Sequence, residues 1–414
     1  MKNVLKNYKS TLILVLAVII GVVVGLLFKD VGVMVKPIGD IFINLLLVII
    51  VPLIFLTITT SISKMNSPRR LGKIMITTLV MFIVTSLVAV VIGFVSTYGM
   101  ELVHVEDGST ILEGINMDDT GSEVELSILE RTATLVTVGS FGELLTTDNL
   151  IALLVFSLLF GIAINMSKEK GEPARKVLES FHEIIMKLLK IIMYYAPVGI
   201  GAYAAYLTST FGASIAVGYL RVFIIYTVVA VLYYLVVYTI YAYIAGKMDG
   251  VKRFWKNVIP ATITALTTCS SAASIPVNSM CAKKIGVSDD IADTVIPLGT
   301  SFHKDGSIIG SVFKIMFLVC LFGTDIGSFG SIGKILLVSL IATLLVTAVP
   351  IGGGTISEMM IITMMGYGVQ ALPILTIIAT VIDPPATMLN VVGDMSTSMM
   401  VSRVVDGKKW MKKK

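Results

Sequence analysis

The chain has 414 residues, of which 56% are hydrophobic and only 14% are charged, and its mean hydropathy is +0.92. Soluble globular proteins carry about 25% charged residues, so the composition excludes an ordinary soluble enzyme or signalling module. The net charge of +5 does not indicate nucleic-acid binding, because the basic residues gather at short breaks between apolar runs. Those runs are about 20 residues long, enough to cross a hydrocarbon core roughly 30 Å thick, and they predict a single all-α membrane domain.

The first apolar run, at residues 11–28, is too long for a signal peptide and is followed by further runs, so we expect a retained helix. Later spans are expected at residues 39–62, 71–99, 150–166, 217–245 and 291–322. The three cysteines lie in apolar stretches, and neither they nor the three histidines have the spacing of a disulfide framework or a metal site.

Lysine and arginine mark one side of the membrane. They cluster in short segments at residues 2–9, 64–73, 168–176, 247–256 and 408–414. By the positive-inside rule these segments are cytoplasmic, which predicts a multi-pass protein of the plasma membrane with both termini inside. Residues 101–149 contain many acidic residues and Arg131 as their single basic residue, so we expect an external loop there.

Charge parity also predicts two re-entrant hairpins. Lys283 and Lys284 would lie outside if the apolar residues 258–280 made one full crossing, whereas a hairpin entering from the cytoplasm keeps them inside. If residues 332–369 made one full crossing, the C-terminal lysines would likewise lie outside. A hairpin that enters from the external side keeps them inside. Oppositely directed hairpins form an inverted repeat, which in transporters places the substrate site near the midplane of the membrane.

Four polar interruptions lie within these segments. The first hairpin has a hydroxyl-rich turn at residues 267–276, and the second has a glycine-rich turn at residues 348–355, where glycine permits close approach to a ligand. The seventh span is interrupted at residues 299–306. The eighth carries a proline pair at residues 384–385 that is expected to break the helix between residues 383 and 394.

Three carboxylates lie within these interruptions, on Asp305, Asp383 and Asp394. A charge at membrane depth costs at least about 2.5–3.5 kcal/mol, so these residues are hard to explain as filler. Together with Asn390 they offer hard oxygen ligands, which suit an alkali cation or an ammonium group.

These motifs resemble those of the glutamate transporter family, the dicarboxylate/amino acid:cation symporters. The matching residues are Ser270-Ser271 with Pro276, Asp305-Gly306, the Pro350 glycine turn, and Asn390-x-x-Gly393-Asp394, in this order and at matching intervals along essentially the whole chain. The resemblance implies eight transmembrane helices plus two oppositely oriented re-entrant hairpins. It also implies a homotrimer in the lipid bilayer and an elevator mechanism, in which a transport domain moves against a scaffold.

The same resemblance divides the chain into nine segments. They are scaffold spans 1–2 (1–70), span 3 of the transport domain (71–100), the acidic external loop (101–149), scaffold spans 4–5 (150–212), span 6 of the transport domain (213–247), hairpin 1 (248–285), span 7 (286–325), hairpin 2 as the gate (326–369), and span 8 with the basic cytoplasmic tail (370–414).

The resemblance also assigns roles to residues. Substrate would be bound by Ser270, Ser271, Pro350, Gly352, Asp383, Thr387 and Asn390. Among these, Asp383 would receive the α-ammonium group and Asn390 the α-carboxylate. Sodium would be bound by Gly299, Asn390 and Asp394 in one site and by Thr85, Ser86 and Asp305 in another, with Ser301 and His303 beside them.

The sequence departs from the family at Ala386, where acidic-amino-acid transporters have an arginine that pairs with the side-chain carboxylate. Nothing bidentate then remains to hold a second carboxylate, which favours a small neutral amino acid. The alternative is an acidic amino acid or dicarboxylate, carried with sodium or protons.

A second departure is His303-Lys304, where the family has asparagine and methionine. Lys304 could replace a sodium ion as a built-in cation, could reach the substrate, or could titrate with His303 and couple transport to protons. We favour the built-in cation, which implies fewer sodium sites than in relatives, or none.

Glu358 is unusual at membrane depth. It either faces the site and favours a polar or cationic substrate side chain, or it caps a helix or faces external water. An anion-conducting channel would need a continuous polar stripe, whereas the polar groups here sit at discrete breaks. The chain is not expected to be an enzyme, because Asp383 and Asp394 lack the setting of an intramembrane aspartyl protease.

Overall fold

The computed structural model describes residues 2–63, 69–103, 137–146, 149–344 and 353–412. These ranges are almost entirely helical and contain no strand, which confirms the predicted all-α class. The helices are α1 (Lys2–Leu27), α2 (Lys29–Met34), α3 (Lys36–Ser63), α4 (Arg69–Thr97), α7 (Phe141–Leu144), α8 (Leu150–Met166), α9 (Glu172–Phe211), α10 (Ala213–Leu232), α11 (Tyr238–Asn257), α12 (Ile259–Thr268), α13 (Ser271–Ile285), α14 (Asp289–Phe302), α15 (Asp305–Phe322), α16 (Phe329–Leu344), α17 (Gly353–Met365) and α18 (Leu372–Val405).

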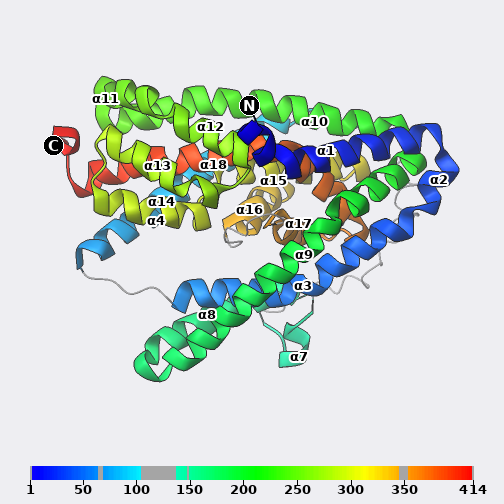
Figure 1. Cartoon of the computed structure of the whole chain (residues 1–414), viewed down its shortest axis with the longest axis horizontal. Coiled ribbons are helices and arrows are strands. Elements are labelled where there is room, and N and C mark those ends of the chain that lie inside the picture. Colours follow the sequence, from blue (N-terminus) through cyan, green and yellow to red (C-terminus); the bar gives the residue numbers. More distant parts are fainter. Residues whose placement is uncertain (1, 64–68, 104–136, 147–148, 345–352, 413–414) are drawn as a thin grey trace.

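The helices fall into two groups. In the first group α9 packs along α1 and α3, and α3 also packs on α8. In Figure 1, α8 and most of α3 lie below the mainly horizontal helices of the second group, and α9 rises obliquely toward the upper right. That second group surrounds α18, which contacts α4, α10, α11, α12, α13, α14, α15 and α17. The assignment of the chain to a scaffold and a transport domain, and their relative movement, stays a prediction.

Burial differs from helix to helix. α15 is buried along almost its whole length, from Asp305 to Phe322, and α18 is buried from its first turn onward. By contrast α4 and α9 expose large apolar side chains on one side, such as Val80, Val84 and Ile191. Exposed apolar stripes on long helices are expected where a helix faces lipid. α15 and α18 are instead surrounded by protein, which is where ionisable groups can be held.

Several of the described helical stretches are long and apolar enough to cross a membrane. These are Lys29–Thr60, Lys73–Thr97, Glu172–Thr210, Ala213–Asn257, Asp289–Phe322 and Val369–Val405. The predicted spans at residues 11–28 and 150–166 are helical too, but their apolar stretches are shorter, at Ile13–Leu27 and Val155–Met166. The chain is thus built as a multi-pass membrane protein, and the number of eight spans stays a prediction.

The predicted breaks are found at two places. α12 and α13 pack on each other and are joined at Cys269 and Ser270, with Cys269 in the left-handed region at φ 47°. This helix–turn–helix lies where the first hairpin was expected. The seventh span is interrupted as predicted, because α14 ends at Phe302 and α15 begins at Asp305.

The eighth span corrects a prediction, because α18 is one continuous helix that contains both Pro384 and Pro385. Prolines remain inside a buried helix where neighbouring elements satisfy the carbonyl groups that lose their partner. The predicted glycine-rich turn of the second hairpin, with Pro350 and Gly352, lies outside the described residues. The helices on either side of it, α16 and α17, pack together.

Candidate functional site

The centre of the candidate site is the break between α14 and α15. His303 leaves the helix with extended backbone at φ −123° and ψ 116°, and Lys304 follows at φ −146° and ψ 67°. Successive side chains of extended backbone point to opposite sides. The side chain of His303 is completely buried, while Lys304 is half-buried. The break therefore places the imidazole in the centre of the protein, while the neighbouring Lys304 lies near enough to Asp394 to interact with it electrostatically.

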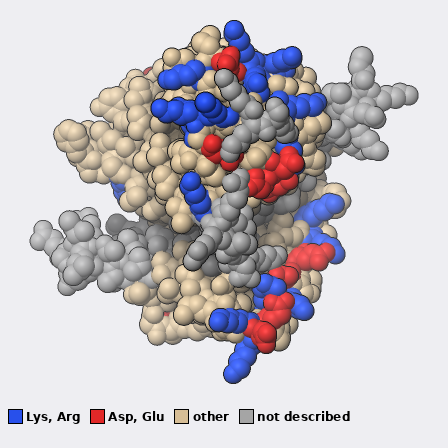
Figure 2. Space-filling view, turned by 90° about the vertical axis from the view of Figure 1, so that its left-hand side faces the viewer, with Lys and Arg blue, Asp and Glu red and all other residues tan. Residues whose placement is uncertain are grey.

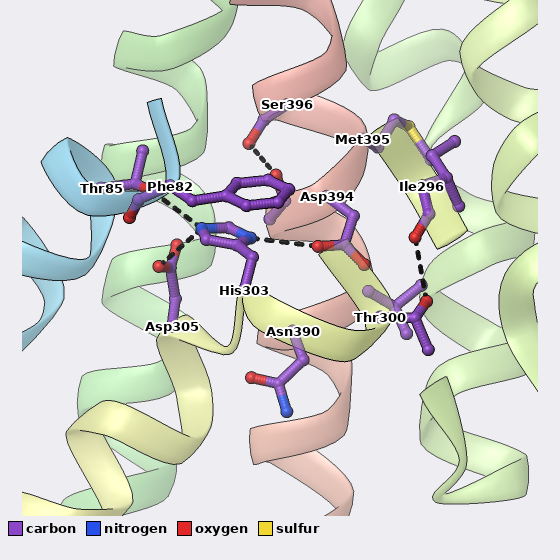
Figure 3. Close-up of polar contacts among 12 residues, drawn as sticks. Phe82, Thr85, Ile296, Thr300, His303, Asp305, Asn390, Asp394, Met395 and Ser396 are labelled. Atoms are coloured by element: carbon purple, nitrogen blue, oxygen red, sulfur yellow. Dashed lines mark hydrogen bonds and ion pairs between the residues drawn. The ribbon is translucent and has the colours of Figure 1, made fainter. Parts of the chain in front are cut away.

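The imidazole of His303 lies between two carboxylates (Figure 3). Its Nε2 atom is 3.0 Å from Asp305 Oδ1 and 2.8 Å from Thr85 Oγ1 of α4, and its Nδ1 atom is 3.0 Å from Asp394 Oδ1 of α18. The ring also stacks on Phe82, with centroids 4.6 Å apart and an interplanar angle of 11°. Both carboxylates are at most 1% exposed. Residues from three parts of the chain thus close around one imidazole.

Two tyrosines complete the surroundings of Asp305. Tyr233 Oη donates to Asp305 Oδ2 at 3.2 Å, and Tyr238 Oη lies 3.4 Å from the same oxygen while donating to Leu389 O at 2.6 Å. Residues five apart differ by about 140° around an α-helix with 3.6 residues per turn. A π turn at Tyr233–Val237 widens the helix between α10 and α11, and it brings both hydroxyl groups to one side.

Two glycines allow the close packing. A Cβ atom on Gly299 would lie 2.1 Å from Asp394 Oδ1, so only glycine lets α14 approach this carboxylate. A Cβ atom on Gly393 would lie 3.0 Å from both His303 Cε1 and Tyr238 Oη. Of the predicted sodium ligands, the structure therefore brings together Thr85, His303, Asp305, Asp394 and Gly299.

The remaining predicted sodium ligands lie nearby without a bond to the imidazole. Ser86 follows Thr85 on α4, and its buried hydroxyl has no hydrogen-bond partner in the described part of the chain. Ser301 is half-buried in the last turn of α14.

The predicted substrate ligands of the eighth span share one face of α18. Asp383, Thr387, Asn390 and Asp394 follow each other at intervals of four, three and four residues, which is the spacing of one helix face. Thr387 Oγ1 donates to Asp383 Oδ1 at 3.3 Å. Asn390 Nδ2 donates to Ser307 Oγ at 3.0 Å, and Asn390 Oδ1 accepts from Ser307 N at 3.2 Å. Asn390 therefore ties α18 to the first turn of α15.

The first hairpin packs on α18, where Asn278 Nδ2 donates to Val391 O at 2.7 Å. At its turn Ser270 caps α13, since its Oγ accepts from Ala273 N at 3.2 Å. Ser271 is the first residue of α13 and is half-buried. In this conformation the Ser270 hydroxyl is engaged with its own helix, while substrate binding by both serines stays a prediction.

Glu358 corrects another prediction, because it neither faces external water nor caps a helix. It is 1% exposed on α17, its Oε1 atom accepts from Lys314 Nζ of α15 at 3.0 Å, and its Oε2 atom accepts from Thr376 Oγ1 of α18 at 2.9 Å. Lys314 is the residue that sequence reasoning missed. A lysine in the middle of the apolar seventh span was a signal, since such a charge requires a partner at membrane depth.

The chain is similar to known proteins along nearly its whole length. Residues 11–404 match the model of the sodium:dicarboxylate symporter family. A proton/sodium-glutamate symport protein of Bacillus caldotenax is 26% identical over 405 residues, which cover 94% of this chain and 92% of the relative. A protein of the same name from Geobacillus stearothermophilus is 25% identical over 410 residues, with the same coverage. This chain therefore belongs to the sodium:dicarboxylate symporter family.

Proposed function

We propose that this protein is a secondary active transporter that takes up a small neutral amino acid by an elevator mechanism. Uptake is driven by a cation gradient, with fewer sodium ions than in relatives or none, and protons are the other candidate. The protein works as a homotrimer in the plasma membrane. Membership of a symporter family supports transport across a membrane, and the central position of α18 supports a transport domain that moves as one unit.

The environment of Ala386 is the observation that supports a neutral substrate. This residue is 7% exposed and lies on α18 between Asp383 and Asn390, where transporters of acidic amino acids have an arginine. Its carbonyl oxygen would lie 2.3 Å from a Cβ atom on Gly306, so α18 and α15 are in close contact here. Lys314, which is near enough to interact electrostatically with Asp383, is already paired with Glu358. Neither residue offers a cation to a second substrate carboxylate.

The distribution of charge supports the proposed orientation. Figure 2 shows the end of the molecule where lysine and arginine gather, and Figure 1 places the α11–α12 and α13–α14 turns and the C-terminus at this end. Exposed lysines of these segments include Lys247, Lys252, Lys256, Lys284 and Lys408. Under the positive-inside rule this end is cytoplasmic.

A thermal-shift screen of the purified protein against the amino acids tests the substrate, because a ligand that binds only the folded state raises the Tm as it saturates the site. We expect one or a few small neutral amino acids to raise the Tm. A rise with aspartate or glutamate alone would instead support the acidic alternative, which the names of the two relatives favour. Saturable, stereospecific counterflow in liposomes separates a transporter from an anion-conducting channel.

A further inference from the structure

We infer that His303 occupies the cation position between Asp305 and Asp394, so that no sodium ion binds at this pair of carboxylates. The inference rests on the proposed cation-coupled transport and says which group takes the place of sodium. It assigns this role to the imidazole of His303, whereas the sequence alone favoured the ammonium group of Lys304.

The distances around the ring leave no room for a metal ion. Hard cations are bound by several oxygen atoms at about 2.3–2.6 Å. Here the Nε2 atom itself lies 3.0 Å from Asp305 Oδ1 and 2.8 Å from Thr85 Oγ1, where a cation shared by these two oxygens would lie. Thr85 Oγ1 is also within hydrogen-bond distance of the carbonyl oxygens of Met81 and Phe82, at 3.0 and 3.1 Å, so this hydroxyl group is already engaged by the backbone and by the imidazole. The ring nitrogen takes the place that a cation would need.

The second ring nitrogen, Nδ1, is in contact with the other carboxylate, Asp394. Nδ1 is 3.0 Å from Asp394 Oδ1, within hydrogen-bond distance. The imidazole therefore lies within 3.0 Å of both carboxylates and takes up the space between them. A buried anion without a partner is strongly unfavourable, and here the partners are groups of the chain itself. The described residues contain no group of three or more acidic, histidine or cysteine side chains arranged to hold a metal.

Residues from several helices pack closely around the imidazole and its carboxylate partner Asp305. Phe82 stacks on one face of the ring, and Gly393 leaves the space next to Cε1 that any larger residue would fill. Tyr233 and Tyr238 take up the other oxygen of Asp305, so that this carboxylate is surrounded by groups of the chain itself. These contacts come from α4, α10–α11, α15 and α18. The polar groups within 3.0 Å of the ring come from three of these elements, α4, α15 and α18, whereas a side chain that merely filled space would need no such partners.

The test measures sodium binding by the purified full-length protein in detergent, with the Tm and radioactive sodium as readouts. Choline replaces sodium at constant ionic strength. We expect the Tm of the unmodified protein to be the same in both salts, with no saturable sodium binding that depends on Asp394. His303→Asn is expected to gain a sodium-dependent rise in Tm, and this rise is expected to disappear in the His303→Asn/Asp305→Asn double variant. The matched control, Lys304→Met, is expected to stay insensitive to sodium.

Two outcomes would overturn the inference. One is saturable sodium binding by the unmodified protein that is lost in Asp394→Asn. This measurement does not need His303→Asn, so it remains valid if that variant does not fold. The other is a sodium-dependent Tm in Lys304→Met but not in His303→Asn, which would return the role to Lys304. Amino-acid binding is scored separately in the same preparation. A protein that binds no amino acid in any salt contradicts the proposed function, whereas sodium binding beside intact amino-acid binding contradicts only the role of His303.

Discussion

The ion pair between Lys314 and Glu358 allows a quantitative prediction about stability. Their charged atoms lie 3.0 Å apart, and the side chains are 7% and 1% exposed. Glu358→Gln removes the negative charge and leaves the Lys314 ammonium buried without its counter-ion. Removing one partner of a buried pair costs about 3–5 kcal/mol. The Thr376 hydroxyl group also loses its carboxylate acceptor, but this adds less to the cost, because Thr376 Oγ1 is also 2.9 Å from Leu372 O and can donate there.

The double variant Lys314→Met/Glu358→Gln is expected to recover most of this loss. Replacing both members of a buried pair by residues of similar size is often neutral or stabilising, by about 1–4 kcal/mol where both are well-packed hydrophobic residues. The four proteins of this double-mutant cycle are compared by unfolding in detergent, where the sum of the single effects should exceed the effect of the double variant by about 3 kcal/mol.

An exposed pair on α3 provides the matched control. Lys36 Nζ and Asp40 Oδ2 are 2.9 Å apart, but the two side chains are 40% and 36% exposed. Asp40→Asn is therefore expected to cost no more than about 1 kcal/mol. Two results would contradict this reasoning: Glu358→Gln lowers the free energy of unfolding no more than Asp40→Asn does, or the two single effects simply add in the double variant. In either case the buried pair would not stabilise the packing of α15 on α17.

Three further predictions concern the site. In the Ala386→Arg variant, aspartate or glutamate should raise the Tm, whereas in the uncharged Ala386→Gln variant they should not. If both variants responded equally to these amino acids, position 386 would not determine the charge of the substrate. Asp383→Asn should weaken amino-acid binding about 10- to 150-fold in titrations followed by Tm, since a hydrogen bond to a charged group contributes about 1.5–3 kcal/mol; unchanged affinity would place the ammonium group elsewhere. Gly393→Ala should cost about 1–3 kcal/mol in detergent unfolding, because its Cβ atom would lie 3.0 Å from the His303 ring and from Tyr238. The control is Gly333→Ala in α16, whose Cβ atom would meet no neighbouring atom; an equal loss of stability in both variants would contradict the steric reason.

The sequence by itself determined the class of protein and the family. Long apolar runs can only be accommodated as membrane helices, and local backbone chemistry marked the turn at Cys269–Ser270 and the break before Asp305. That Asp383, Thr387 and Asn390 share one face of α18 follows only from the continuous helix of the structure, because residues spaced by three or four lie on the same side of a helix. The expected break at Pro384 was wrong, since a helix surrounded by neighbours can hold a proline that an isolated helix would not.

Only the tertiary structure decided which charged groups meet. His303 and Lys304 are adjacent at the break, and their order along the chain does not tell that the imidazole lies between Asp305 and Asp394. Nor does the chain reveal that Lys314 pairs with Glu358, 44 residues away on another helix. The physical reason is the same in both cases. The energy of a buried charge depends on the distance and direction of its counter-charge, and these are set by how α4, α15, α17 and α18 pack together.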